Sequence, residues 1–259
     1  MKMTSFTIPS SMTIIKEGTF RYFNLLKKVV ITDKVRSIKN SAFAYCTRLE
    51  SVIFPSSVTS IGDLAFDKCS SLKQITLPSS LHTIGNYAFN ECSSLMEVTF
   101  PTIGESTLKQ CSSLQQLIFN SSLTSIGNYA FNECSSLKQI NLPSSLISIG
   151  VSAFNKCSSL KQIILPPSLR SIGVNAFAFC TSLEDVKILS SLSFIQIKMF
   201  FGCSALKEIV IPPSATSIKN SAFMNCSSLA KVTIPPSVKL IEENAFEGCP
   251  LLSKDMISS

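Results

Sequence analysis

Apolar and polar positions follow one another along this chain in a pattern that repeats every 23 residues. Counted from a cysteine as position 1, apolar side chains recur at positions 1, 4, 7, 9, 13, 16, 20 and 21. The run 134–154 shows the pattern in full, and it begins again at Cys157. A fixed period of this length is typical of solenoids, in which each repeat buries its apolar side only against its neighbours.

Each repeat predicts two short strands and a tighter segment. Leu137, Ile140 and Leu142 are spaced by three residues and then by two. The two-residue spacing predicts a strand with one face inward. Proline usually follows at position 10 and should end the strand, because it cannot donate to the sheet's hydrogen-bond ladder. Pro-Ser-Ser turns the chain, and Leu-x-Ser-Ile-Gly predicts a second extended segment. The apolar spacing in Ala-Phe-x-x-Cys-x-x-Leu fits one helical turn, so we expect helical turns on the outer wall.

The motif Leu-x-x-Ile-x-Leu followed by a structured return is the leucine-rich-repeat pattern. Its form here, with Ala-Phe-x-x-Cys and Leu-Pro-Ser-Ser-Leu-x-x-Ile recurring about ten times in register, resembles the BspA-like leucine-rich-repeat family over nearly the whole chain. The resemblance implies an α/β leucine-rich-repeat solenoid: a curved, right-handed stack of about eleven 23-residue turns, with a parallel β-sheet on the concave face. It also implies a binding or adhesion role and no catalytic residues.

We expect a single solenoid domain over residues 1–259 whose regularity changes along its length. It divides into worn N-terminal repeats (1–45), regular repeats (46–179) with four residues missing near 101–104, a degenerate repeat (180–202), further repeats (203–248) and a C-terminal cap (249–259). The deletion removes the Ser-Ser-Leu-x segment behind an intact strand. An unbroken sheet with a local pinch is therefore expected, either as a tolerated deletion or as a functional hinge.

The ten cysteines occupy one column of the repeat, and we predict that they are buried free thiols. Equivalent side chains in a stack point the same way about 4.8 Å apart, whereas a disulfide needs convergent Cβ atoms about 3.8 Å apart. Phe23 lies one period before Cys46, which indicates an apolar slot where free cysteine behaves as a small hydrophobe. No Cys-x-x-Cys pair or histidine partner supports a zinc site.

The positive charge belongs to one end of the chain. Residues 1–48 contain nine basic and two acidic side chains, and the remaining 211 residues contain 14 of each. The candidate basic patch consists of Arg21, Lys27, Lys28, Lys34, Arg36 and Lys39. It either solubilises an uncapped edge or contacts an acidic protein, an anionic membrane surface or a polyanion. Nucleic acid is not expected, because no aromatic residues interleave with the charges in a recognised module.

The same N-terminal repeat predicts self-association. An uncapped strand edge and an exposed end face are templates for pairing, while the like charges resist it until salt screens them. We expect a weak, salt-promoted homodimer through this repeat, to be checked by sedimentation at low and high salt.

Two sets of outward positions are candidates for an interaction. Position 8 of the first strand is β-branched at eight of ten places and includes Ile53, Ile118, Ile164 and Val210. These residues form either an adhesive strip or simply the surface that an exposed sheet prefers. The second set surrounds the degenerate repeat and consists of Phe179, Phe194, Phe201 and Met224. It is either an exposed apolar cluster for a partner or a group buried by local repacking.

Catalysis finds little support in the sequence. His82 is the only histidine, and no phosphate-binding glycine loop, metal-ligand spacing or nucleophile elbow is present. Neither an enzyme nor a cofactor is therefore expected, and no signal peptide or membrane-spanning run is recognised. We expect a non-catalytic scaffold for an unidentified protein partner. Its location is left open: the lack of a recognised signal peptide and the unpaired thiols favour the cytoplasm, and the family resemblance favours the cell surface. The alternative, implied by the family resemblance, is a cell-surface adhesin that contacts host or matrix proteins.

Overall fold

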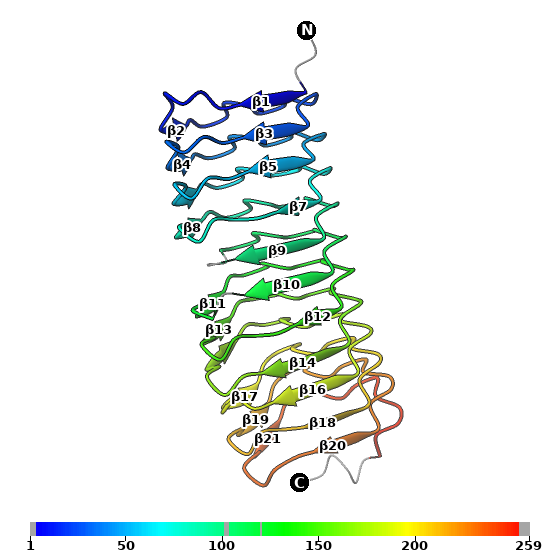
Figure 1. The fold of residues 1–259 in the computed structure, drawn as a ribbon. Coiled ribbons are helices and arrows are strands. Elements are labelled where there is room, and N and C mark those ends of the chain that lie inside the picture. The colour runs from blue at the N-terminus through cyan, green and yellow to red at the C-terminus, as the bar shows by residue number, and fades with distance from the viewer. Residues whose placement is uncertain (1–3, 101–103, 120, 254–259) are drawn as a thin grey trace.

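The computed structural model describes residues 4–100, 104–119 and 121–253, which wind into an elongated stack of coils (Figure 1). Each regular coil has three sides, and two of them are short strands. We call the first row of strands the first sheet: β1 (Ser5–Thr7), β3 (Lys28–Val30), β5 (Ser51–Ile53), β7 (Gln74–Ile75), β9 (Glu97–Phe100), β10 (Gln116–Phe119), β12 (Gln139–Ile140), β14 (Gln162–Leu165), β16 (Asp185–Ile188), β18 (Glu208–Val210) and β20 (Lys231–Thr233). The other row is the second sheet: β2 (Ile14–Ile15), β4 (Ser37–Ile38), β6 (Ser60–Ile61), β8 (Thr83–Ile84), β11 (Ser125–Ile126), β13 (Ser148–Ile149), β15 (Ser171–Ile172), β17 (Phe194–Ile195), β19 (Ser217–Ile218) and β21 (Leu240–Ile241).

All strand pairs are parallel and join equivalent positions of successive coils. In the first sheet Gln116 pairs with Gln139, and in the second sheet Ile126 pairs with Ile149. The register follows from burial, because slipping a strand by one residue would turn its inward isoleucine or valine out to water. The predicted solenoid of parallel strands is therefore confirmed, while its curvature, the concave position of the first sheet and its handedness stay predictions.

The third side of the coil is built from turns, which corrects the predicted helical turns and with them the α/β class. No helix occurs in the part of the chain that the structure describes. The amide of Phe43 donates to the Ala65 carbonyl of the next coil at 2.8 Å, whereas the amide of Cys46 donates to the Phe43 carbonyl of its own coil at 3.2 Å. Two residues of this segment, Ser41 and Tyr45, have left-handed φ angles of 53° and 62°. A helix keeps its hydrogen bonds within its own segment, while this alternation makes a third ladder between coils.

Stacked phenylalanine rings line the inside of this third side. The Phe154 ring stacks on Phe131 with centroids 5.1 Å apart and on Phe177 at 5.3 Å. The series runs from Phe20 to Phe246 with one substitution, Leu108, in the shortened coil. The rings supply a continuous apolar column through the stack.

The cysteines are all unpaired and buried, as predicted. Each thiol donates to a main-chain carbonyl of the preceding coil: the Cys157 sulfur, for example, lies 3.3 Å from the Phe131 carbonyl oxygen. The argument from Phe23 was wrong, however, because its side chain is 43% exposed. The thiols are buried instead because each one packs against the main chain of a residue of the stacked column, whose carbonyl accepts its hydrogen bond.

The described part of the shortened coil is joined to its neighbours through the first sheet and through the turn ladder. The first sheet continues through β7, β9, β10 and β12, so the predicted unbroken sheet is confirmed. The turn ladder also continues, since the Glu91 amide donates to the Lys109 carbonyl at 2.8 Å. In the second sheet no described strand lies between β8 and β11. The missing segment falls at 101–103, outside the described residues, as does part of the predicted cap (254–259), and the hinge stays a prediction.

Candidate interaction surfaces

The predicted strip of β-branched residues lies on the outer face of the first sheet. Ile53, Ile118, Ile164 and Val210 are exposed to 48%, 47%, 49% and 61%. They are not contiguous, because polar residues of intervening coils separate them. Asn141, for example, stands between Ile118 and Ile164. The structure therefore brings these side chains onto one face without joining them into an adhesive strip.

Two grooves flank this face where β10, β12 and β14 cross it. At the beginning of these strands lies a groove of about 530 Å³, which we call the lysine groove and which is lined by Gln115, Gln116, Lys138, Gln139, Lys161 and Gln162. At the end of β12 and β14 lies a smaller groove of about 220 Å³, the leucine groove, whose lining includes Asn141, Leu142, Ile164, Pro166 and Leu189. β12 and β14 thus run from a polar, basic groove to a more apolar one.

The lysine groove carries positive charge that the protein compensates only in part, since Glu184 on the next coil interacts with Lys161 without forming an ion pair. In the same column of the repeat, Lys27 pairs with Glu50 at 3.1 Å and Lys207 pairs with Glu184 at 3.0 Å. Lys138 and Lys161 are exposed and form no ion pair with any residue that the structure describes. Two adjacent coils therefore present ammonium groups side by side, and an external anion would relieve their repulsion.

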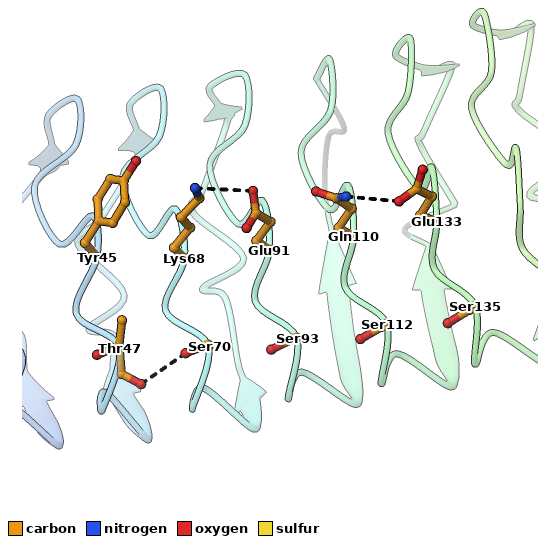
Figure 2. Close-up of a pocket in the computed structure, with 10 residues that line it drawn as sticks. All are labelled: Tyr45, Thr47, Lys68, Ser70, Glu91, Ser93, Gln110, Ser112, Glu133 and Ser135. Atoms are coloured by element: carbon orange, nitrogen blue, oxygen red, sulfur yellow. Dashed lines mark hydrogen bonds and ion pairs between the residues drawn. The ribbon is translucent and has the colours of Figure 1, made fainter.

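A larger groove, of about 590 Å³, runs along the turn ladder (Figure 2). One row of its lining precedes the cysteines and the other follows them; the residues are Tyr45, Thr47, Lys68, Ser70, Glu91, Ser93, Gln110, Ser112, Glu133 and Ser135. Figure 2 shows the long side chains standing in one row and the hydroxyls in the other.

The charges of this turn groove neutralise one another. Lys68 lies 3.6 Å from Glu91, and Glu133 accepts hydrogen bonds from Lys156 at 2.9 Å and from Gln110 at 3.0 Å. The bonds from Lys156 and Gln110 hold the pKa of Glu133 below its ordinary value. The turn groove is therefore the larger hollow but offers fewer unsatisfied groups than the lysine groove.

The candidate aromatic group is divided between two faces. Phe179 and Phe201 meet edge to face with centroids 5.0 Å apart, and the Phe179 ring lies over Gly202, where a side chain would collide with it. Met224 is half-buried in the same column as Phe201. Phe194 lies instead in β17 of the second sheet, with the Lys219 ammonium 5.7 Å from its ring. The structure thus supports a pair with a neighbouring methionine rather than a cluster of four.

The candidate basic residues encircle one end of the stack. Lys28 lies in β3 of the first sheet, Arg36 and Lys39 flank β4 of the second sheet, and Lys34 lies between these strands. Lys27 is paired with Glu50. The Arg21 guanidinium lies over the rings of Tyr22 and Tyr45 on the turn side, at 4.9 and 5.6 Å. These charges form a ring around the first coils rather than a patch on one side.

Sequence reasoning missed both grooves of the first sheet. The signal for the lysine groove was present, because lysine recurs at position 5 of two adjacent repeats and is followed each time by glutamine. Leu189 was visible only as a departure from the usual proline. Its 57% exposure depends on how the neighbouring coil packs, which the repeat pattern does not specify.

Two rows of short parallel strands and a third ladder of turns define a β-solenoid repeat protein. The chain matches the BspA type Leucine rich repeat region in six copies, over residues 1–102, 101–207 and 193–259, and it belongs to that family. No curated protein matched the chain. Within the described residues no helix is long and apolar enough to cross a membrane.

Solved structures of bacterial leucine-rich-repeat proteins share the fold. One from Bacteroides ovatus is 28% identical, with a TM-score of 0.72 over 96% of this chain and 77% of that one. A leucine rich cell surface protein from Faecalibacterium prausnitzii is 29% identical, with a TM-score of 0.52 over 96% of this chain and 86% of that one. A T. pallidum leucine-rich-repeat protein is 28% identical, with a TM-score of 0.52 over 70% of this chain and 78% of that one.

Proposed function

We propose that this chain is a non-catalytic scaffold that binds a protein partner through the first sheet over β10, β12 and β14. The observation that carries the proposal is that the exposed Ile164 lines the leucine groove, while Ile118 is exposed in β10, the strand that begins at the lysine groove. Membership of a leucine-rich-repeat family supports it, because a solenoid offers an extended surface to a partner.

Binding at this face would use side chains rather than strand addition. The main-chain groups of β9, β10 and β12 are engaged between coils, where they pair these strands with one another. Ile118 and Ile164 each leave about half of their surface in water. Covering the remainder is worth on the order of 1 kcal/mol per side chain, which is the size of a typical interface contribution.

The proposal is tested by capturing partners from the source cells with the full chain and comparing variants by quantitative mass spectrometry. We expect Ile118→Ser or Ile164→Ser to lower recovery of a specific partner about ten-fold. The matched control is Ile147→Ser, because Ile147 is equally exposed, at 48%, but precedes β13 of the second sheet. Equal recovery with all three variants contradicts the assignment of the face.

A cell-surface adhesin is the second candidate. It is favoured by the likeness to the Faecalibacterium prausnitzii protein, which is described as a cell surface protein. Labelling intact source cells with an impermeant amine reagent separates the candidates, because an adhesin is labelled at its exposed lysines and an internal scaffold is not.

Three further surfaces remain proposals of smaller scope. The ring of basic residues around the first coils is suited to an acidic surface. The N-terminal repeat is proposed to form the weak, salt-promoted dimer. The Phe179–Phe201 pair with Met224 is proposed as a secondary apolar contact.

A further inference from the structure

We propose that the first sheet recognises an acidic peptide segment in extended conformation. One carboxylate side chain of the segment enters the lysine groove, and one apolar side chain, four residues away, enters the leucine groove. This inference rests on the proposed function and specifies the chemistry of the partner.

The lysine groove has the groups that a carboxylate requires. Lys138 and Lys161 lie on adjacent coils, linked by the Lys161 amide to the Lys138 carbonyl at 3.5 Å. Neither forms an ion pair within the described ranges. Glu184, on the coil next to Lys161, is bound by Lys207 at 3.0 Å and interacts with Lys161 only at longer range. A carboxylate placed between the two ammonium groups would accept charge-assisted hydrogen bonds from both. The adjoining glutamines Gln116, Gln139 and Gln162 add amide donors in a row.

The leucine groove is suited to an apolar side chain. Leu189 takes the place that proline holds in most repeats, and its side chain is 57% exposed at the groove. Leu142 and Ile164 complete an apolar wall beside it. A leucine-sized side chain seated there would remove exposed apolar surface of both molecules from water.

The separation of the grooves sets the spacing of the two recognised residues. Lys138 and Leu142 are four residues apart on one strand path, which spans about 13 Å in extended chain. An extended peptide lying along the same direction covers that distance in four residues. Because alternate side chains of an extended chain share a face, residues i and i+4 would both point at the sheet.

The charge of the surrounding face favours a peptide over a polyanion. Asp185 and Glu208 are exposed on the two coils that follow Lys161, where their carboxylates lie 3.9 Å and 3.8 Å from the ammonium groups of Lys187 and Lys231. A nucleic acid or polyphosphate would carry its negative charges onto these carboxylates. A peptide with a single acidic side chain beside an apolar one places no negative charge next to these carboxylates.

The experiment compares two pools of synthetic peptides that differ in one charge. The first pool has Glu-x-x-x-Leu and the second has Gln-x-x-x-Leu, with x drawn from glycine, serine and threonine, and binding to the full chain is read by fluorescence anisotropy. We expect the glutamate pool to bind about ten-fold more tightly. The double variant Lys138→Gln, Lys161→Gln should abolish this difference. The control Lys73→Gln, an exposed lysine in the same column, should preserve it.

Further arms distinguish the alternatives. Leu189→Ser should weaken both pools equally, and Glu-x-x-Leu peptides, which cannot place both side chains on one face, should bind no better than the glutamine pool. Equal affinity for the glutamate and glutamine pools, or no binding of either, overturns the inference. In that case the proposed function still stands if Ile118→Ser reduces partner capture. If capture is also unchanged, both the inference and the proposed function are wrong. Polyphosphate that binds more tightly than the glutamate pool and is lost with the double lysine variant overturns it in favour of a polyanion.

Discussion

Replacing Phe154 by alanine should lower the free energy of unfolding by about 3–5 kcal/mol. Phe154 is fully buried and lies between the rings of Phe131 and Phe177, so its removal leaves a cavity lined by aromatic faces. Denaturant unfolding followed by circular dichroism measures the loss. The matched control is Phe194→Ala, because Phe194 is 41% exposed and its removal creates no such cavity.

The damage from Phe154→Ala should remain local. Each coil contacts only its neighbours, so the coupling between distant coils is weak. Hydrogen exchange should therefore show lost protection in the coils that contain Phe131, Phe154 and Phe177, with little change near Phe43. A uniform loss of protection along the whole chain would contradict a nearest-neighbour solenoid.

The stack and its register could be predicted because one burial pattern is imposed on every repeat. Ile140, Ile149 and Phe154 mark the inward positions of one coil, and their equivalents recur after each period. Only parallel stacking in register keeps all of these positions inside. The strand predicted from Leu137, Ile140 and Leu142 and the extended segment predicted over Leu-x-Ser-Ile-Gly accordingly correspond to the two observed rows of strands.

The structure of the turn side could not be predicted, because the residue types in this segment do not distinguish a helical turn from the observed series of turns. Apolar residues three and four positions apart fit a helical turn and also fit the observed alternation of turns. The left-handed residues that distinguish the two include Tyr45, Lys68 and Glu91, none of which signals a positive φ. Gly202 and Gly248 are the glycines of that column, and two coils do not define a pattern.

The exposure of the candidate residues was easier to predict than their grouping. Ile118 and Ile164 face water because position 8 alternates with the inward positions of the strand. The grooves depend on contacts between coils, such as Leu189 beside Ile164. Phe194 was assigned to the wrong neighbours, because position 15 lies on the second sheet and not on the turn side.

The buried cysteine column makes the stability of the folded protein depend on pH in the alkaline range. Burial raises the pKa of eight of the ten thiols above the ordinary value of 9.0, to about 11 for Cys46 and to about 12 for Cys180. Cys226 and Cys249 are hydrogen-bonded to each other, which raises the pKa of Cys226 and lowers that of Cys249. Folding therefore requires the eight thiols to keep their protons. In the unfolded chain they are exposed and release them near the ordinary pKa.

Raising the pH above about 9 should therefore unfold the protein steeply. Below that pH both states hold the thiol protons, and stability does not depend on them. Above it the unfolded chain binds fewer protons than the folded one, so stability falls until the pH passes the raised pKa values of the folded state. Each thiol contributes about 1.4 kcal/mol per pH unit, and the eight together contribute about 11 kcal/mol per pH unit to global unfolding.

Circular dichroism between pH 7 and pH 11, in the presence of a reductant, measures this alkaline transition. Changing Cys134, Cys157 and Cys180 together to alanine should reduce the slope by about 4 kcal/mol per pH unit, whatever the cost of the changes at neutral pH. Return to pH 7 should restore the spectrum, which separates deprotonation from irreversible oxidation. A spectrum that is constant to pH 11, or a slope that the triple variant leaves unchanged, would show that the buried thiols do not control the stability of the folded chain.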